Sequence, residues 1–207
     1  MNIVDYILLA LLVAMVIVGS KKGLLRELTA FFTLIPAVVV SINFMDIFSV
    51  IVYEKIGGSP MVVTFLSFIL LLGIAYAVFK LLGMGIARIV HLQRKGRKDQ
   101  MGGAFLGFMR GWVVMSFIFF LLFLLPMPAG FYLAVEDSFF GPTLIKTVPF
   151  MYETSTSLHP DNTSFFSKVE SALMLKEAGV RLTPETRSDV DLVLYQIQRF
   201  FTVGPGT

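Results

Sequence analysis

The chain has 207 residues, of which 56% are hydrophobic and 15% are charged, and its mean hydropathy is +0.81. Soluble domains carry about 45–50% apolar and about 25% charged residues, so the composition excludes an ordinary soluble domain and indicates a membrane protein. The absence of cysteine excludes disulfides, thiolate metal sites and cysteine nucleophiles, and two histidines argue against a histidine metal centre. The net charge of +3 comes from cations between apolar runs, so nucleic-acid binding is not predicted.

Four long apolar segments predict an all-α membrane protein with four transmembrane helices. About 20 residues at ~1.5 Å each cross the ~30 Å of hydrocarbon in a bilayer. The expected helices cover residues 3–20, 28–48, 61–82 and 103–125. The first is the shortest, and we expect Ser20 and the stems of Lys21 and Lys22 to complete its crossing. Residues 1–125 would therefore form the transmembrane domain.

The basic residues between these segments predict the orientation of the chain. Lys21, Lys22 and Arg26 lie between the first two segments, whereas the connection that contains Glu54 and Lys55 is nearly neutral. A second basic group separates the third and fourth segments: Arg88, Arg94, Lys95, Arg97 and Lys98. Because cytoplasmic loops collect Lys and Arg, both basic loops should be cytoplasmic and both termini periplasmic, in a bacterial inner membrane.

The tail, residues 126–207, has a different character and is expected in the periplasm. Prolines divide it into short pieces at Pro126, Pro128, Pro142, Pro149 and Pro160. Two amphipathic helices are predicted, one over Ser164–Lys176 and one that begins with Thr183 as N-cap and Pro184 at the first helical position. Their apolar stripes are Phe165, Val169, Leu173 and Leu175 in the first, and Val190, Val193, Leu194, Ile197, Phe200 and Phe201 in the second. The stripes can pack on each other or on the membrane surface, or they can bind a partner.

Glycines recur at helical spacing near both basic loops. Gly103, Gly107 and Gly111 are four residues apart and form a flat strip on one face of the fourth helix. Gly19 and Gly23 repeat the spacing at the end of the first segment. Small residues let two membrane helices approach backbone to backbone, so these five glycines are predicted helix-packing residues.

Besides Asp46 and Lys80, late in the second and third segments, five charged residues are candidates for a role inside or at the edge of the membrane: Asp5, Arg26, Glu27, Asp99 and Arg110. A charge inside a span is costly unless it has a partner, so Arg110 should point into the bundle. Asp5 can cap the start of the first helix, where the helix dipole favours an acid. Two interpretations stay open for the group: structural ion pairs, or a wet path that conducts ions or protons.

These residues carry a resemblance to a known family. Asp5, Gly19, the run Gly23–Leu28 and the block Asp99–Trp112 resemble the colicin V production protein family, abbreviated CvpA, over about residues 1–125. The resemblance implies a small bacterial inner-membrane protein connected with production or export of a peptide toxin and with envelope function. It brings no catalytic role to the matching positions, which are Asp5, Gly19, Gly23, Arg26, Glu27, Asp99, Gly103, Gly107, Arg110 and Gly111.

Similar four-helix modules anchor some periplasmic serine proteases, but the tail of this chain is too short for such a protease domain. It also contains no G-x-S-x-G motif, and His159 beside Pro160 is typical of a solvated loop rather than a catalytic base. We therefore expect no enzyme activity and no cofactor.

Two hypotheses for function follow. The first is a non-enzymatic assembly or partner-docking factor that supports toxin production or secretion and envelope maintenance. The alternative is a small oligomeric channel or transporter that uses the buried Asp, Glu and Arg residues. The expected partners are the lipid bilayer and either further copies of the chain or other envelope proteins.

Overall fold

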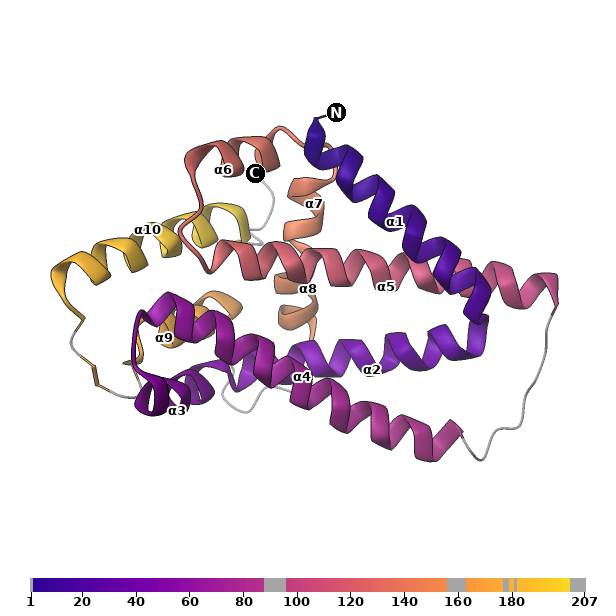
Figure 1. Ribbon diagram of the computed structural model, residues 1–207, viewed down its shortest axis with the longest axis horizontal. Helices are drawn as coiled ribbons and strands as arrows, with labels where there is room; N and C mark the ends of the chain where they lie inside the picture. The colour runs from indigo at the N-terminus through magenta and orange to yellow at the C-terminus, as the bar shows by residue number, and fades with distance from the viewer. Residues whose placement is uncertain (1, 88–95, 156–162, 177–178, 181, 202–207) are drawn as a thin grey trace.

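A computed structural model of the chain describes residues 2–87, 96–155, 163–176, 179, 180 and 182–201 (Figure 1). Within these residues the chain forms helices joined by short turns. In chain order the helices are α1 (Ile3–Lys22), α2 (Leu24–Asn43), α3 (Met45–Ile56), α4 (Pro60–Ala87), α5 (Arg97–Phe123), α6 (Ala129–Glu136), α7 (Gly141–Ile145), α8 (Thr147–Thr154), α9 (Phe165–Leu173) and α10 (Pro184–Phe201).

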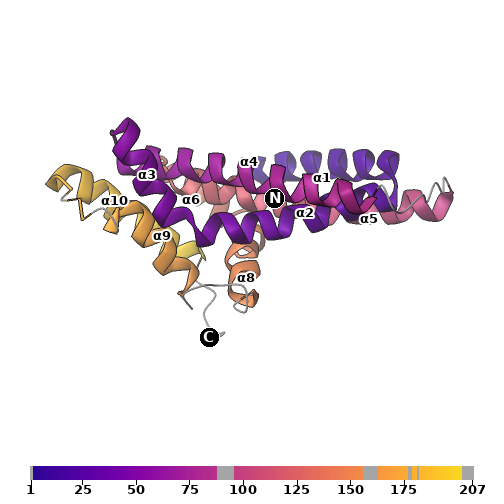
Figure 2. The same cartoon turned by 90° about the horizontal axis from the view of Figure 1, so that it is seen from below.

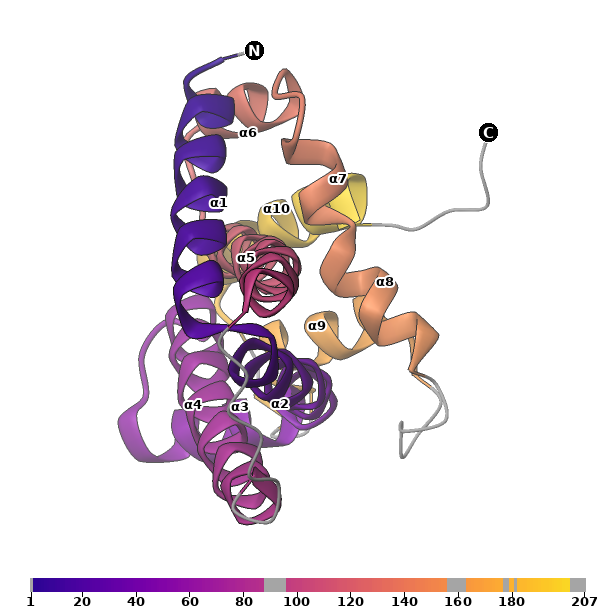
Figure 3. The same ribbon diagram turned by 90° about the vertical axis from the view of Figure 1, so that its right-hand side faces the viewer.

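Among the described residues, four helices are long and apolar enough to cross a membrane, which confirms the predicted fold class. They are α1, α2, residues 60–83 of α4, and α5. Figure 3 looks almost along α5 and shows α1 at one side of it, with α2 and α4 below. Helix α5 packs against both α1 and α2, and α2 also packs against α4. The four spans therefore form one bundle with α5 and α2 at its centre.

The second apolar segment forms two helices instead of one, although its hydropathy shows no interruption. Instead of one helix over residues 28–48, α2 ends at Asn43, Phe44 leaves the helical conformation, and α3 starts at Met45. Figure 2 shows that α3 turns steeply away from the line of α2. Asn43 and Asp46, on either side of the break, are buried and bind groups of the tail. These contacts explain a break that hydropathy does not indicate.

Helix α5 is longer than the hydrocarbon core is thick. It starts at Arg97, ahead of the predicted residue 103, and its 27 residues extend over about 40 Å. Its last turns lie among aromatic side chains of the tail: the ring of Phe120 is 5.3 Å from that of Phe165, and the ring of Phe123 is 5.1 Å from that of Phe200. The tail thus covers the C-terminal turns of α5, whereas the residues that exceed the predicted span are at its start.

Both predicted amphipathic helices are present, and the rest of the protein buries their apolar stripes. The first is shorter than predicted: α9 ends at Leu173 instead of Lys176, and Leu175 lies beyond it with a φ of +49°. Ser164 caps α9 by accepting a hydrogen bond from the Ser167 N–H, and the Thr183 hydroxyl accepts one from the Thr186 N–H at the start of α10. All ten predicted stripe residues are buried. Helix α9 packs on α2, α3, α4 and α10, and α10 packs on α4, α5 and α7 as well as on α9. The stripes therefore belong to the same hydrophobic core as the spans.

Two buried polar contacts attach the tail to the α2–α3 break. The Lys168 ammonium lies 2.8 Å from an Asp46 carboxylate oxygen, and both side chains are almost fully buried. The Tyr152 hydroxyl donates a hydrogen bond of 3.1 Å to Asn43 Oδ1. Burial raises the pKa of the Tyr152 phenol, so the hydroxyl keeps its proton and remains a donor. These contacts fix α8 and α9 against α2 and α3.

The Asp46–Lys168 pair gives a prediction about stability. Lys168→Met leaves a buried carboxylate without its lysine and should lower the free energy of unfolding by about 3–5 kcal/mol. The double variant Asp46→Leu/Lys168→Met removes both charges and should recover most of that loss. Unfolding of the purified protein in mild detergent, followed by circular dichroism, measures both. A single variant as stable as the parent would show that the pair does not hold α9 on α3.

Candidate functional site

The glycines of α1 and α5 lie against each other. A Cβ built on Gly107 would lie 2.6 Å from the Met15 carbonyl oxygen and 2.9 Å from the Gly19 Cα. A Cβ on Gly19 would in turn collide with the Gly103 carbonyl oxygen, and one on Gly111 would lie 2.8 Å from the Met15 Cβ. Since these neighbours are mostly backbone atoms, they cannot move aside as a flexible side chain could. The two helices therefore approach as closely as their main chains permit.

Gly23 joins α1 to α2 and is held by α5. Its φ of +82° is a conformation that suits glycine, and its N–H donates to the Gly19 carbonyl to close α1. The N-cap residue of α2 is Gly23, so no N-cap side chain binds the first N–H groups of α2. Instead the Asp99 carboxylate, from the first turn of α5, accepts a hydrogen bond of 2.9 Å from the Leu24 N–H. A carboxylate at a helix N-terminus satisfies a free N–H group and favours the helix dipole.

A buried carboxylate and two cations meet between α1, α2 and α5. The Glu27 side chain is fully buried, and one of its oxygens lies 3.1 Å from an Arg110 guanidinium nitrogen. Lys22 approaches the other oxygen at 3.6 Å from the half-exposed end of α1. Arg110 also directs a guanidinium N–H toward the Met15 sulfur at 4.0 Å. Neither Glu27 oxygen has a hydrogen-bond partner among the described residues, so these two cations of the same chain balance the buried charge through ion pairing alone.

Asp5 lies at the opposite end of α1, in a separate network. Its carboxylate accepts hydrogen bonds from the Asn2 N–H, the Ser138 hydroxyl and the Phe140 N–H, at 2.9, 2.6 and 3.1 Å. Asn2 completes a capping box by accepting from the Val4 and Asp5 N–H groups. Asp5 therefore closes the start of α1 and fastens the α6–α7 turn to it.

The structure brings most of the predicted site residues together where α1, α2 and α5 meet. The five glycines, Asp99, Glu27 and Arg110 form this layer. Four of the five glycines lie in the α1–α5 contact, Gly23 lies at the joint beside Asp99, and Glu27 pairs with Arg110. Arg26 is exposed, and the arginine that reaches Glu27 is Arg110. The two histidines and the basic residues Arg88, Arg94 and Lys95 lie outside the described residues.

Sequence reasoning missed the residues that connect the tail to the spans. No sequence motif marks these residues, which are Ser138, Asn43, Tyr152, Asp46 and Lys168. One signal was available, because Lys168 is one position before Val169 and three after Phe165, on the apolar side of α9. A lysine on the buried side of a helix indicates a buried partner.

The chemistry that this layer offers is ion pairing and hydrogen bonding. Among the described residues, no group of three or more His, Cys, Asp or Glu side chains could hold a metal ion. Lys22 and Arg110 both pair with Glu27, and Asp99 binds the N-terminus of α2.

Comparison with known proteins gives a family match. The family model described as colicin V production protein matches residues 4–149, which include all the residues of the α1, α2 and α5 layer and the Asp5 contacts to Ser138 and Phe140. The chain belongs to the colicin V production protein family. The match also extends beyond the spans to α8, so the family segment includes the first part of the tail. No curated protein and no solved structure matches the chain.

The glycine contact gives a second prediction. Gly107→Leu places a side chain where the α1 backbone lies and should cost at least the ~1–3 kcal/mol of an overpacked core. Gly73→Leu is the matched control, because Gly73 also lies in a span but no atom outside its own helix segment is within 4 Å of its Cβ position. Thermal unfolding in the same detergent should show a clear loss for Gly107→Leu and little change for Gly73→Leu. Equal stabilities would show that the α1–α5 contact is not close-packed in the membrane.

Proposed function

We propose that this protein is a non-enzymatic, multi-pass factor of the bacterial inner membrane that supports production or secretion of a peptide toxin and maintenance of the envelope by docking partner proteins. The observation that carries the proposal is the internal pairing of its membrane charges. Glu27 and Arg110 bind each other, Asp99 caps α2, and Asp5 binds the α6–α7 turn. Charges used in this way hold the helices together rather than line a path.

Apolar side chains outside the spans support partner docking. Ile47 and Ile51 of α3, and Phe44 immediately before it, are each about half exposed. Leu192 and Tyr195 are exposed at neighbouring positions of α10, opposite its buried stripe. Exposed apolar side chains grouped on one surface are typical of interaction sites. Both helices lie near the end of the bundle that carries the tail, where a periplasmic partner would meet them (Figure 2).

A channel or transporter is the alternative, and one observation favours it. The Glu27–Arg110 pair is a buried ionisable pair on two candidate spans, with the half-exposed Lys22 beside it. Buried ionisable groups in membranes often mark ion or proton paths. This alternative requires the charges themselves, whereas a docking factor requires only the packing that they hold in place.

The double variant Glu27→Gln/Arg110→Gln separates the two functions. It removes both charges but keeps two side chains that can hydrogen-bond, whereas Arg110→Gln alone leaves a buried carboxylate with only Lys22 nearby. For a docking factor, the single variant should lose several-fold in membrane abundance and toxin release, and the double variant should recover both.

The same variants are tested for flux after reconstitution into liposomes. The parent protein should be silent to ions and protons. If the parent conducts, and if the stably inserted double variant loses both conduction and toxin release, the transport alternative replaces the docking proposal.

The proposed orientation makes a separate prediction. Because the chain has no cysteine, a single introduced cysteine reports its own side of the membrane. In intact cells, Lys21→Cys should resist a membrane-impermeant thiol reagent and Lys55→Cys should react, since the α1–α2 joint should be cytoplasmic and the α3–α4 turn periplasmic. Both positions are exposed and should react after the membrane is permeabilised. The reverse labelling pattern would invert the topology.

A further inference from the structure

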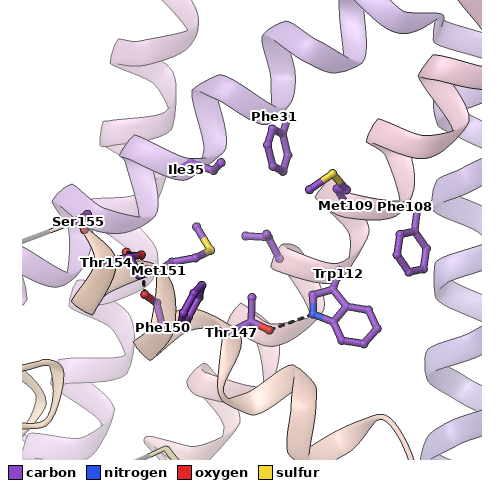
Figure 4. Close-up of a pocket in the computed structure, with 11 residues that line it drawn as sticks. Phe31, Ile35, Phe108, Met109, Trp112, Thr147, Phe150, Met151, Thr154 and Ser155 are labelled. Carbon is purple, nitrogen blue, oxygen red and sulfur yellow. Dashed lines mark hydrogen bonds between the residues drawn. The ribbon is translucent and has the colours of Figure 1, made fainter. Parts of the chain in front are cut away.

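An apolar groove of about 630 Å³ lies between α2, α5 and α8. Figure 4 shows the side chains around it: Phe31 and Ile35 come from α2, Met109 and Trp112 from α5, and Phe150 and Met151 from α8. Aromatic, aliphatic and thioether groups form most of its wall.

The polar groups of the groove are bound within the protein. The Thr147 hydroxyl accepts a hydrogen bond of 2.9 Å from the Trp112 indole N–H and donates one to the Thr143 carbonyl. Thr154 donates to the Phe150 carbonyl, and Ser155 donates to the Tyr152 carbonyl. Because these hydroxyl protons are already used, the groove favours an apolar ligand over a polar one.

The position of the groove along two candidate spans places it at the depth of the hydrocarbon, and it places α8 there too, although α8 belongs to the tail. Two of its walls, α2 and α5, are candidate spans, and its α5 residues lie between 108 and 113, near the middle of that helix. The third wall, α8, is not a candidate span and projects to one side of α2 and α5 (Figure 2). The medium beside apolar, half-exposed side chains of spanning helices is lipid.

We propose that this groove binds one acyl chain of a membrane phospholipid. Its volume lies within the ~300–1,000 Å³ of small-molecule sites. A transmembrane helix from a second copy is ~10–12 Å wide with its side chains, so the groove could hold only one side of it, whereas a flexible acyl chain can lie along the groove. The bound acyl chain fills the space between α8 and the two spans α2 and α5. Phospholipid is then a specific ligand of this protein in addition to its surrounding medium. The proposal does not depend on the docking function.

Trp112 provides the test, because it is the single tryptophan of the chain and lines the groove. The full-length protein in mild detergent is titrated with phosphatidylcholine that carries bromine atoms on one acyl chain, and tryptophan fluorescence is recorded. Bromine quenches an indole that it touches, so an occupied groove gives quenching that saturates near one lipid per protein. Unbrominated phosphatidylcholine should compete and restore the fluorescence.

Two variants identify the groove as the site. Ile35→Phe fills part of the space, and Phe150→Ala removes an exposed part of the wall, so each should weaken the saturable quenching at least several-fold. Leu81→Phe is the control, because Leu81 is exposed on α4, away from the groove. Circular dichroism establishes that each variant is folded, and Phe150→Ala, at a side chain that is 57% exposed, should fold even if Ile35→Phe does not.

Two results would overturn the proposal. Quenching that rises in proportion to brominated lipid without saturation, and equally in all variants, would mean that Trp112 only meets bulk lipid or detergent. No quenching of the folded parent would mean that the groove is closed or is filled by protein.

Discussion

The backbone contact between α1 and α5 sets the geometry on which the other membrane contacts depend. In lipid, apolar side chains gain little by leaving an apolar surrounding, so close packing and polar contacts have to hold helices together. Glycine at positions 19, 103 and 107 has no side chain that would separate the two backbones. That approach brings Asp99 to the Leu24 N–H and places Arg110 within reach of Glu27. A change at these glycines would therefore disturb the charge pairs as well as the packing.

The tail completes the bundle at its other end. Helix α5 is longer than a bilayer requires, and its last aromatic residues find partners in α6, α9 and α10 instead of lipid. Asp46 and Lys168 add a buried ion pair, and Asp5 fastens the α6–α7 turn to the start of α1. Buried polar contacts of this kind fix a single arrangement because misplaced partners would leave a buried charge alone. The spans and the tail thus share one core.

Two kinds of surface remain for interaction. The exposed apolar positions of α3 and α10 lie outside the candidate spans. The groove between α2, α5 and α8 lies beside the spans and suits a lipid chain, because its hydroxyl groups are bound within the protein. The paired charges, in contrast, are directed inward. The division is physical: charges need partners inside the bundle, whereas apolar surfaces can remain available at its periphery.

The sequence by itself determined the membrane class, the four spans, the two amphipathic helices and the residues of the glycine and charge layer, because each depends on local composition or on helical spacing. The same residues also indicated the family. That resemblance covered only about residues 1–125, whereas the family match continues into the tail as far as α8. Only the tertiary structure decided which charges meet, since Glu27 pairs with Arg110 across 83 positions of the chain and Asp99 caps a helix from 75 positions away. The break at Phe44 was equally hidden, because Asn43 and Asp46 gain their partners Tyr152 and Lys168 only when the tail folds back on α2 and α3. Contacts between residues so distant in sequence leave no periodic pattern, so hydropathy alone predicts one continuous helix there.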